Sequence, residues 1–196
     1  MRKKILILTN SIDGLFSFRK EVVKAILTKG YDVHISVTKG AKEKEDYFIN
    51  EGCKIENQVI DRRGINPIKD IKLLISYNKL IKKTKPHIIL TYTIKPNIYG
   101  GFVARCNRIP QLANITGLGS SLNNSRIQKM VLALYRIGLS KAAIVFYQNS
   151  SIKDFCQKNH IGNKGVLLPG SGVDLNWHSF HPYPQEGERI RFLFIG

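Results

Sequence analysis

The sequence predicts an α/β fold in which about seven mostly parallel strands form one doubly wound sheet. Short apolar runs alternate with helical stretches along residues 1–168, an order that is typical of parallel sheets. The runs are unbroken stretches of Ile, Leu and Val, as in strands that helices cover on both faces. Two central runs, 87–92 and 111–115, each lead into a loop in which the backbone can approach a ligand closely.

The first half of the domain is predicted to hold three strands and three helices. The strands are expected at Lys4–Thr9, Tyr31–Thr38 and Lys54–Ile60, and the helices at about Phe16–Lys29, Ala41–Asn50 and Pro67–Lys83. Gly30 suits the end of the first helix, and proline is well tolerated in the first turn of the third.

The second half continues the same series with four strands and further helices. The strands are expected at His87–Tyr92, Gln111–Ile115, Ala142–Tyr147 and Gly165–Leu168. Amphipathic patterns predict a helix over Ser125–Lys141, and Asn149-Ser150 is expected to cap another that reaches about Lys158.

Three of these helices have one side that is expected to face the core. The apolar residues assigned to that side are Phe18, Val22, Val23, Ile26 and Leu27 in the first helix, Ile68, Ile71, Leu74, Ile75 and Ile81 in the third, and Ile127, Met130, Val131, Leu134 and Ile137 in the helix over 125–141. The opposite sides of the last two helices are rich in Lys and Arg. Each such helix taken alone is expected to be a core helix with a solvated basic face.

The domain organisation changes after residue 168. Residues 1–168 are expected to form one domain, and residues 169–188, rich in turn formers and without periodicity, an interdomain linker. Residues 189–196 (RIRFLFIG) have the pattern of a buried strand, which we expect to be the first strand of a second domain that is absent. The alternative is an edge strand of the same domain.

The net charge of +17 is concentrated in one region of the chain. Between Asp70 and Asp154 there is no acidic residue, whereas 13 of the 31 Lys and Arg lie there. A region of one sign attracts anions such as phosphate groups, acidic lipid headgroups or nucleic acid. Together with the basic helices, this favours contact with an anionic membrane surface.

Several classes of site and location find no support in the sequence. Cys53, Cys106 and Cys156 are widely spaced, so we expect buried free thiols in a cytoplasmic chain rather than a disulfide framework. His178 and His181 have no nearby Cys or carboxylate, which disfavours a zinc site. The GxGxxG motif is missing, which disfavours an enzyme that uses nicotinamide or flavin, and the Walker A motif is missing as well. No DxD motif occurs either, which disfavours the metal-dependent nucleotide-sugar enzymes of the other common transferase fold.

Three loops at the ends of strands remain as candidates for a ligand site. They are residues 10–14, 93–97 and 116–121, of which the first and last contain Gly14, Gly117 and Gly119. Loops of this kind bind phosphate through backbone N–H groups and helix N-termini without a metal. Asp13 is the one carboxylate in these loops, and a lone loop Asp is more often a turn former or cap, so the catalytic residues stay unknown.

The order of motifs resembles the N-terminal half of glycosyltransferase family 4. The motifs are KILILT before a loop and helix, YTIKPNIYG, TGLG, PGSGVD with a following Phe180-x-Pro182, and FLFIG. The resemblance covers essentially all 196 residues, and it is strongest to bacterial members that extend lipid-linked capsule, O-antigen or glycan intermediates. PGSGVD is typical of the crossing between two domains, and YTIKPNIYG with TGLG is typical of the polyprenyl-linked subgroup.

The resemblance implies a Rossmann-like domain that is half of a GT-B fold, and retaining transfer from a nucleotide-sugar to a polyprenyl-diphosphate-linked acceptor, with no required metal and no other cofactor. It also implies a peripheral location on the inner face of the plasma membrane. In such enzymes the C-terminal domain holds most of the nucleotide and a Glu-x7-Glu element. That element is absent here, so this chain alone is expected to be inactive.

Mapped onto this sequence, the resemblance assigns roles to particular residues. Gly14 would lie near the donor phosphates, and the cleft would be lined by Lys95, Asn97, Thr116, Gly117 and Gly119. Gly172, Val173 and Asp174 would form the interdomain hinge. Many relatives have His-Gly where this chain has Thr116-Gly117, so no catalytic histidine can be assigned.

Two other functions remain as alternatives. A nucleotide-sugar epimerase of the same two-domain shape should place a histidine and acid/base carboxylates in its cleft, and this half offers few. A basic nucleic-acid-binding module should interleave aromatic and basic residues on one face. Here Phe and Tyr fall mostly in strands or on apolar helix sides, so we expect no nucleic-acid partner.

Overall fold

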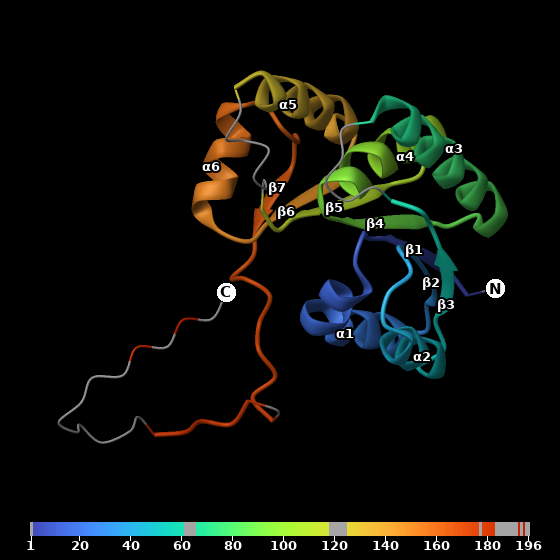
Figure 1. Cartoon of the computed structure of the whole chain (residues 1–196), viewed down its shortest axis with the longest axis vertical. Coiled ribbons are helices and arrows are strands. Elements are labelled where there is room, and N and C mark those ends of the chain that lie inside the picture. Colours follow the sequence, from blue (N-terminus) through green and yellow to red (C-terminus); the bar gives the residue numbers. More distant parts are fainter. Residues whose placement is uncertain are drawn as a thin grey trace.

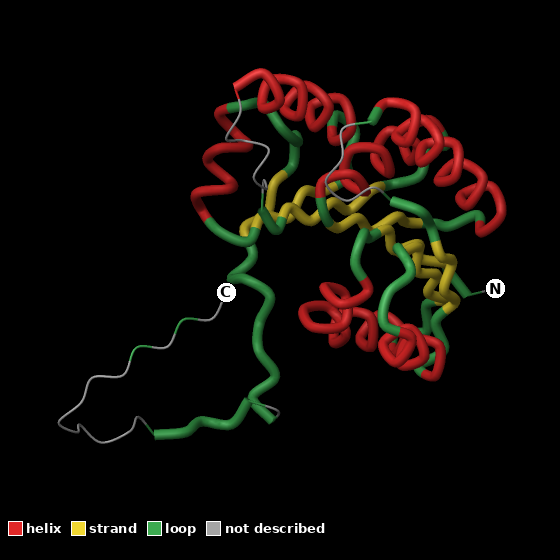
Figure 2. Tube along the Cα trace, in the orientation of Figure 1, coloured by secondary structure: helices red, strands yellow, loops and turns green. Residues whose placement is uncertain are grey.

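The computed structural model describes residues 2–60, 66–117, 125–176, 178–182, 192 and 194. In this part of the chain, seven parallel strands form one sheet with helices on both faces (Figures 1 and 2). The strands are β1 (Lys4–Leu8), β2 (Asp32–Val37), β3 (Lys54–Asn57), β4 (Ile88–Tyr92), β5 (Gln111–Ile115), β6 (Ile144–Tyr147) and β7 (Gly165–Leu167). The α/β, Rossmann-like prediction of about seven strands is therefore confirmed.

The strand order is β3-β2-β1-β4-β5-β6-β7. The chain moves outward from β1 through β2 to β3 and then returns to the other side of β1 with β4. The loops that leave β1 and β4 therefore diverge to opposite faces of the sheet. In open parallel sheets this reversal leaves a crevice at the carboxyl ends of the two strands, where ligands bind.

The helices divide between the two faces of the sheet. They are α1 (Ile12–Thr28), α2 (Lys42–Asn50), α3 (Pro67–Thr84), the π-helical turn η1 (Pro96–Gly100), α4 (Gly101–Cys106), α5 (Ser125–Leu139) and α6 (Ser150–Lys158). In Figure 1, α1 and α2 lie below the sheet, and α3, α4 and α5 lie above it. This division follows from right-handed crossovers on either side of the reversal.

The helix starts are set by capping side chains. The Ser11 hydroxyl accepts a hydrogen bond from the Gly14 N–H at 3.1 Å, and the Asn149 side chain accepts one from the Ile152 N–H at 2.8 Å. The predicted cap at Asn149 is confirmed. The predicted start of the first helix at about Phe16 is wrong, because the Ser11 cap starts α1 at Ile12 and places Gly14 in its first turn.

The core consists of clusters on both faces of the sheet. The largest fully buried side chains include Phe48 below the sheet and Tyr77 and Tyr135 above it. Cys53 and Cys156 are buried free thiols as expected, but Cys106 is exposed, because it lies in the last turn of the short helix α4. The expectation that all three cysteines fill the interior is therefore wrong for Cys106.

The core sides assigned to the helices are wrong in part. Phe18 and Val22 of α1 are 61% and 41% exposed, and the buried series in that helix is Leu15, Arg19 and Val23. In α3 the buried residues are Leu73, Tyr77, Leu80, Ile81 and Thr84, so Ile68, Ile71 and Ile75 face outward. Met130 and Ile137 of α5 are likewise exposed. Because α3 carries apolar residues on both sides, its periodicity could not decide which side is buried.

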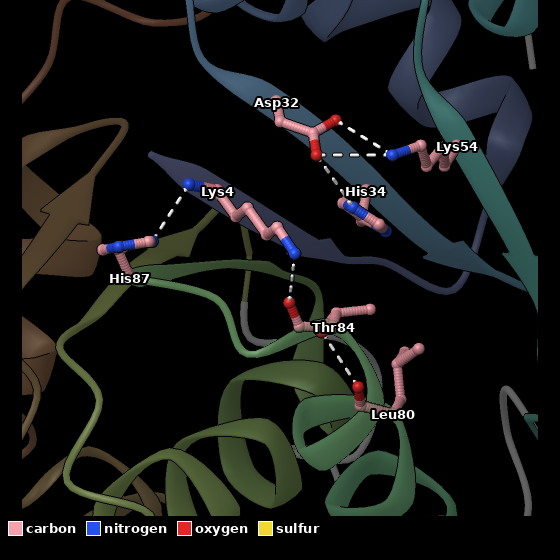
Figure 3. A network of polar contacts seen from close by, with 7 residues as sticks. All are labelled: Lys4, Asp32, His34, Lys54, Leu80, Thr84 and His87. Atoms are coloured by element: carbon pink, nitrogen blue, oxygen red, sulfur yellow. Dashed lines mark hydrogen bonds and ion pairs between the residues drawn. The ribbon is translucent and has the colours of Figure 1, made fainter. Parts of the chain in front are cut away.

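Polar side chains connect the amino ends of the central strands, at the edge of the sheet opposite to the crevice (Figure 3). The Lys4 N–H donates to His87 Nδ1 at 3.0 Å, and Lys4 Nζ donates to the Thr84 carbonyl at 3.2 Å. Asp32, at the start of β2, lies 3.4 Å from Lys54 Nζ and from His34 Nε2. The contacts of Lys4 tie β1 to the end of α3 and to the residue before β4, and those of Asp32 tie β2 to β3.

The chain after β7 has no helix or strand in residues 168–176 and 178–182, and it runs away from the sheet (Figure 2). Most of the predicted strand at 189–196 lies outside the described residues. The division into a domain over 1–168, a linker over 169–188 and a strand over 189–196 therefore stays a prediction.

Candidate functional site

A cleft of about 400 Å³ lies at the carboxyl ends of β1, β4 and β5. Its lining comes from the loop after β1 and the start of α1, from the ends of β4, β5 and β6, and from the segment after β7. The lining residues are Thr9, Asn10, Ser11, Gly14, Leu15, Phe18, Arg19, Tyr92, Thr93, Thr116, Gln148 and Ser171. The position agrees with the rule that open parallel sheets bind ligands where the strand order reverses.

The first turn of α1 forms one wall of this cleft. Ser11 and Gly14 both line it, and the 17-residue helix has its positive dipole end there. A side chain at position 14 would contact Ser11 at an ordinary distance of 3.6 Å, so the glycine is not needed to avoid a clash within the protein. A role of Gly14 in admitting a ligand to the helix start stays a prediction.

Thr93 holds a strained backbone conformation beside the cleft. Its φ of 71° lies in the left-handed region, which β-branched residues rarely adopt. The carbonyl of Thr93 accepts the Asn97 N–H at 3.0 Å, so this conformation leads the chain from β4 into η1. Strained residues and π-helical turns both occur preferentially at functional sites.

Arg19 is the one charged side chain among the residues that the structure places along the cleft. It is only 7% exposed, and its guanidinium carbon lies 5.4 Å from the centre of the Tyr92 ring. Burial lowers the pKa of the guanidinium, with the nearby Tyr92 acting in the opposite direction. Burial likewise raises the pKa of Tyr92 to about 12, which Arg19 opposes, so the tyrosine is neutral at physiological pH.

Gly14, Thr116 and Gly117 lie at the expected edge of the sheet. Gly14 and Thr116 line the same cleft, and Gly117 directly follows Thr116 at the end of β5. A side chain at position 117 would meet nothing within 4 Å, so this backbone is open to a ligand. Gly119 lies outside the described residues. Roles for these residues in binding stay predictions.

Lys95 belongs to the same edge but does not line the cleft. Its Nζ lies 2.6 Å from Asp70 Oδ1 in the first turn of α3, and both side chains are nearly buried. The Tyr99 hydroxyl donates to the other oxygen of Asp70 at 2.8 Å. In this structure Lys95 therefore holds α3 against η1, and its charge is neutralised within the protein.

Asn97 is 1% exposed and lies behind the cleft, in a polar network within the core. The Thr91 hydroxyl donates to Asn97 Oδ1 at 2.7 Å, and Asn97 Nδ2 donates to the Asn114 carbonyl at 3.0 Å. Gln111 Nε2 donates to both the Thr91 hydroxyl and the Asn97 carbonyl at 3.0 Å. These contacts fix η1 against β4 and β5, which form the floor of the cleft.

The predicted hinge residues lie in the exposed segment after β7. Gly172 has a φ of 75°, which favours glycine, and Val173 is 66% exposed. Asp174 accepts a hydrogen bond from the Asn176 N–H at 2.9 Å in a local turn. Just before them, Ser171 lines the cleft and its hydroxyl accepts from Gln148 at 3.1 Å. A hinge role stays a prediction.

The sequence interpretation missed Arg19, Tyr92 and Gln148. The burial of Arg19 could have been predicted from the sequence, because Leu15, Arg19 and Val23 follow one another at intervals of four and so share a helix face. A charged residue within a buried series is the informative exception.

In the described part of the chain, no group of three or more His, Cys, Asp or Glu is placed to hold a metal ion.

Comparison of the chain with known proteins identifies its family. The model of the family described as Glycosyl transferase 4-like matches residues 4–149 of this chain. The UDP-Gal:alpha-D-GlcNAc-diphosphoundecaprenol alpha-1,3-galactosyltransferase of Escherichia coli is 29% identical over 130 residues, which are 64% of this chain and 33% of that protein.

Solved structures show the same fold at low sequence identity. A glycosyltransferase from Rickettsia africae ESF-5 has a TM-score of 0.66 at 16% identity, over 92% of this chain and 47% of its own. A UDP-N-acetylglucosamine 2-epimerase has a TM-score of 0.63 at 15% identity, over 85% of this chain and 48% of its own. The chain thus spans a third of its curated relative and about half of each of these structures. With the family model matched over most of its length, the chain belongs to the glycosyl transferase 4-like family.

Proposed function

We propose that this chain is the acceptor-side part of an enzyme that transfers a sugar from a nucleotide-sugar to a polyprenyl-diphosphate-linked glycan. The observation that carries the proposal is the relationship to a galactosyltransferase whose name gives UDP-Gal as donor and a diphosphoundecaprenol-linked sugar as acceptor. The cleft supports it, because it combines a helix N-terminus, hydroxyl groups and one buried arginine around a space for a phosphorylated ligand. As part of the proposal, the transfer retains the anomeric configuration, needs no metal, and serves the synthesis of a bacterial surface polysaccharide such as a capsule.

The test of this activity is sugar transfer into lipid. Membranes from cells that express or lack the gene for this chain would be incubated with radiolabelled nucleotide-sugars and extracted with organic solvent. We expect gene-dependent label in the extract, released by mild acid because that treatment cleaves glycosyl diphosphates. Label that stays in the aqueous phase with every nucleotide-sugar would contradict the proposal.

The alternative of a nucleotide-sugar epimerase has one observation in its favour, the fold that this chain shares with UDP-N-acetylglucosamine 2-epimerase. The described residues around the cleft include no histidine and no carboxylate that could move protons to and from a sugar carbon. The same incubations separate the two functions. An epimerase would convert the free nucleotide-sugar to its epimer without labelling any lipid.

We further propose that the outer face of α3 contacts an anionic membrane. This face, called here the α3 outer face, consists of the exposed residues Ile68, Lys69, Ile71, Lys72, Ile75, Lys79, Lys82 and Lys83. Its three isoleucines are 67%, 56% and 51% exposed, which is unusual for such large apolar side chains on one helix. Apolar residues flanked by lysines suit the boundary between acidic headgroups and acyl chains, where each lysine contributes about 1 kcal/mol.

Vesicle flotation tests the α3 outer face. No helix in the described part of the chain has the length and apolarity to cross a bilayer. We expect flotation with vesicles rich in phosphatidylglycerol, and several-fold less when Ile68, Ile71 and Ile75 are all replaced by Gln. The control is Ile49→Gln, at a 50% exposed isoleucine on α2 below the sheet. Equal flotation of all three proteins, or binding to nucleic acid but not to vesicles, would contradict this proposal.

A further inference from the structure

Arg19 is buried on the side of α1 that packs toward the sheet. Its neighbour in sequence, Phe18, is 61% exposed, whereas Arg19 is 7% exposed and lies one turn from Leu15, which is 1% exposed. Removing a guanidinium from water is costly unless its N–H groups find partners. The position of Arg19 therefore calls for an explanation beyond packing.

The contacts that Arg19 makes with the described residues leave most of its hydrogen-bonding capacity unused. Its Nη1 donates to the carbonyl of Phe18 at 2.8 Å, and its guanidinium faces the Tyr92 ring at 5.4 Å. Among the described residues it forms no ion pair with a carboxylate. A guanidinium has five N–H donors, so the described contacts use one of them.

The groups around Arg19 suit an anion rather than a cation. Within the described residues, no Asp or Glu lines the cleft, whereas Ser11 and Thr116 contribute hydroxyl groups. The first turn of α1 adds backbone N–H groups and the positive end of a helix dipole, one to two turns from Arg19 on the same helix. The arginine and the helix start therefore lie on the same wall of one cleft.

We propose that Arg19 is a substrate-binding residue whose free N–H groups hold the oxygens of a substrate diphosphate in this cleft. The planar guanidinium can donate two parallel hydrogen bonds to phosphoryl oxygens, and its position over the Tyr92 ring holds it beside the cleft. The inference rests on the proposed sugar transfer for one point only, that a diphosphate is the relevant ligand. That diphosphate belongs to the nucleotide-sugar or to the polyprenyl acceptor.

Titration of the chain with inorganic pyrophosphate tests Arg19 directly. We expect wild type to bind and Arg19→Gln to bind about 10- to 100-fold more weakly, because charge-assisted hydrogen bonds are lost. The matched control is Arg105→Gln, since Arg105 also lies over an aromatic ring, Phe102 at 5.3 Å, but on the surface of α4. The control should bind like wild type.

Two organic ligands then identify the source of the diphosphate. UDP represents the donor and farnesyl diphosphate represents the acceptor, and we expect one of them to displace pyrophosphate from wild type and to bind Arg19→Gln at least tenfold more weakly. Uridine and farnesol, which lack the diphosphate, should displace nothing. Binding of pyrophosphate without competition by either organic diphosphate would overturn the assignment to a substrate.

A measurement on wild type covers the case in which Arg19→Gln does not fold. The side-chain N–H signal of Arg19 in a ¹⁵N-labelled chain should shift during the pyrophosphate titration, while that of Arg105 should not. An unshifted Arg19 signal at saturation, equal affinity of the Arg19→Gln variant, or no binding to wild type would each overturn the proposal. These results are independent of lipid labelling, so this inference and the proposed sugar transfer can fail separately.

Discussion

Lys95 and Asp70 form a nearly buried ion pair, with Nζ 2.6 Å from Oδ1, that joins the segment after β4 to the first turn of α3. The two residues are 25 positions apart in sequence, and Asp70 lies at the boundary of the region that has no acidic residue. The pair uses the lysine charge to position η1, which carries Asn97 and supports the floor of the cleft.

Replacing Lys95 by Met should destabilise the fold. Among the described residues, the change leaves the Asp70 carboxylate, which is 13% exposed, with the Tyr99 hydroxyl as its side-chain partner. Breaking a buried pair from one side typically costs about 3 kcal/mol or more. Urea unfolding would measure the loss. Lys83→Met is the control, because Lys83 pairs with Glu56 at 67% exposure and such pairs contribute less than about 1 kcal/mol. Equal losses in the two variants would show that the Lys95 pair is not special.

Asn97→Ala should lower the stability of the fold, and any effect on ligand binding should follow from that loss. Asn97 connects Thr91 to the Asn114 carbonyl in the core, and leaving such groups without partners costs about 1–3 kcal/mol each. We expect a lower midpoint of urea unfolding with an unchanged slope. Asn10→Ala, in the lining of the cleft, should change stability by less than about 0.5 kcal/mol. A stable Asn97→Ala variant would show that this side chain is dispensable for the fold.

Thr93→Asn should raise stability by about 1 kcal/mol. The φ of 71° strains a β-branched residue, whereas asparagine adopts the left-handed region more readily. Thermal unfolding would show the increase in Tm. Thr116→Asn is the comparison, at a threonine in the same cleft whose φ is not positive, and it should bring no gain. A lower Tm for Thr93→Asn would mean that the threonine makes compensating contacts.

Asp32 should make the stability of the fold sensitive to acid. Burial raises the pKa of its carboxyl, but the hydrogen bond and charge of Lys54 and the charge of His34 lower it by more, so the pKa lies below its ordinary value. A pKa that is lower in the folded than in the unfolded chain stabilises the fold above the unfolded value and loses this contribution as the pH falls through the folded value. Asp32→Asn should thus cost about 1 kcal/mol at pH 7, and this cost should disappear as the pH falls through the pKa of Asp32 in the folded chain. A pH-independent difference in unfolding free energy would contradict this origin.

The sequence predicted the fold well because strand and helix periodicities are local. The unbroken apolar runs located the strands, and caps such as Asn149 located helix starts. It could not decide between the two apolar sides of α3, since Ile68, Ile71 and Ile75 form as regular a series as Leu73, Tyr77 and Leu80. That choice depends on the shape of the neighbouring sheet and helices, which periodicity does not contain.

The sequence predicted the position of the candidate site better than it predicted the side chains that line it. The sheet edge and the loops were located because the carboxyl ends of parallel strands lie together. Lys95 and Asn97 were expected in the cleft, but their side chains turn to Asp70 and to the core. Conversely, Arg19 lies in a helix for which the sequence analysis assigned only apolar residues to the buried side. Tertiary partners decide such orientations, and for Lys95 the partner is 25 residues away.

Together, our proposals place a substrate diphosphate in the cleft beside β1 and β4 during sugar transfer to a lipid-linked glycan. Mass spectrometry of polyprenyl-diphosphate-linked glycans can test this in cells that lack the gene and in cells that carry wild type, Arg19→Gln or Arg105→Gln in its place. We expect a lipid-linked glycan that is one sugar short in cells without the gene and in cells with Arg19→Gln, and normal glycans with the other two. An unchanged lipid pool in cells without the gene would rule out this function.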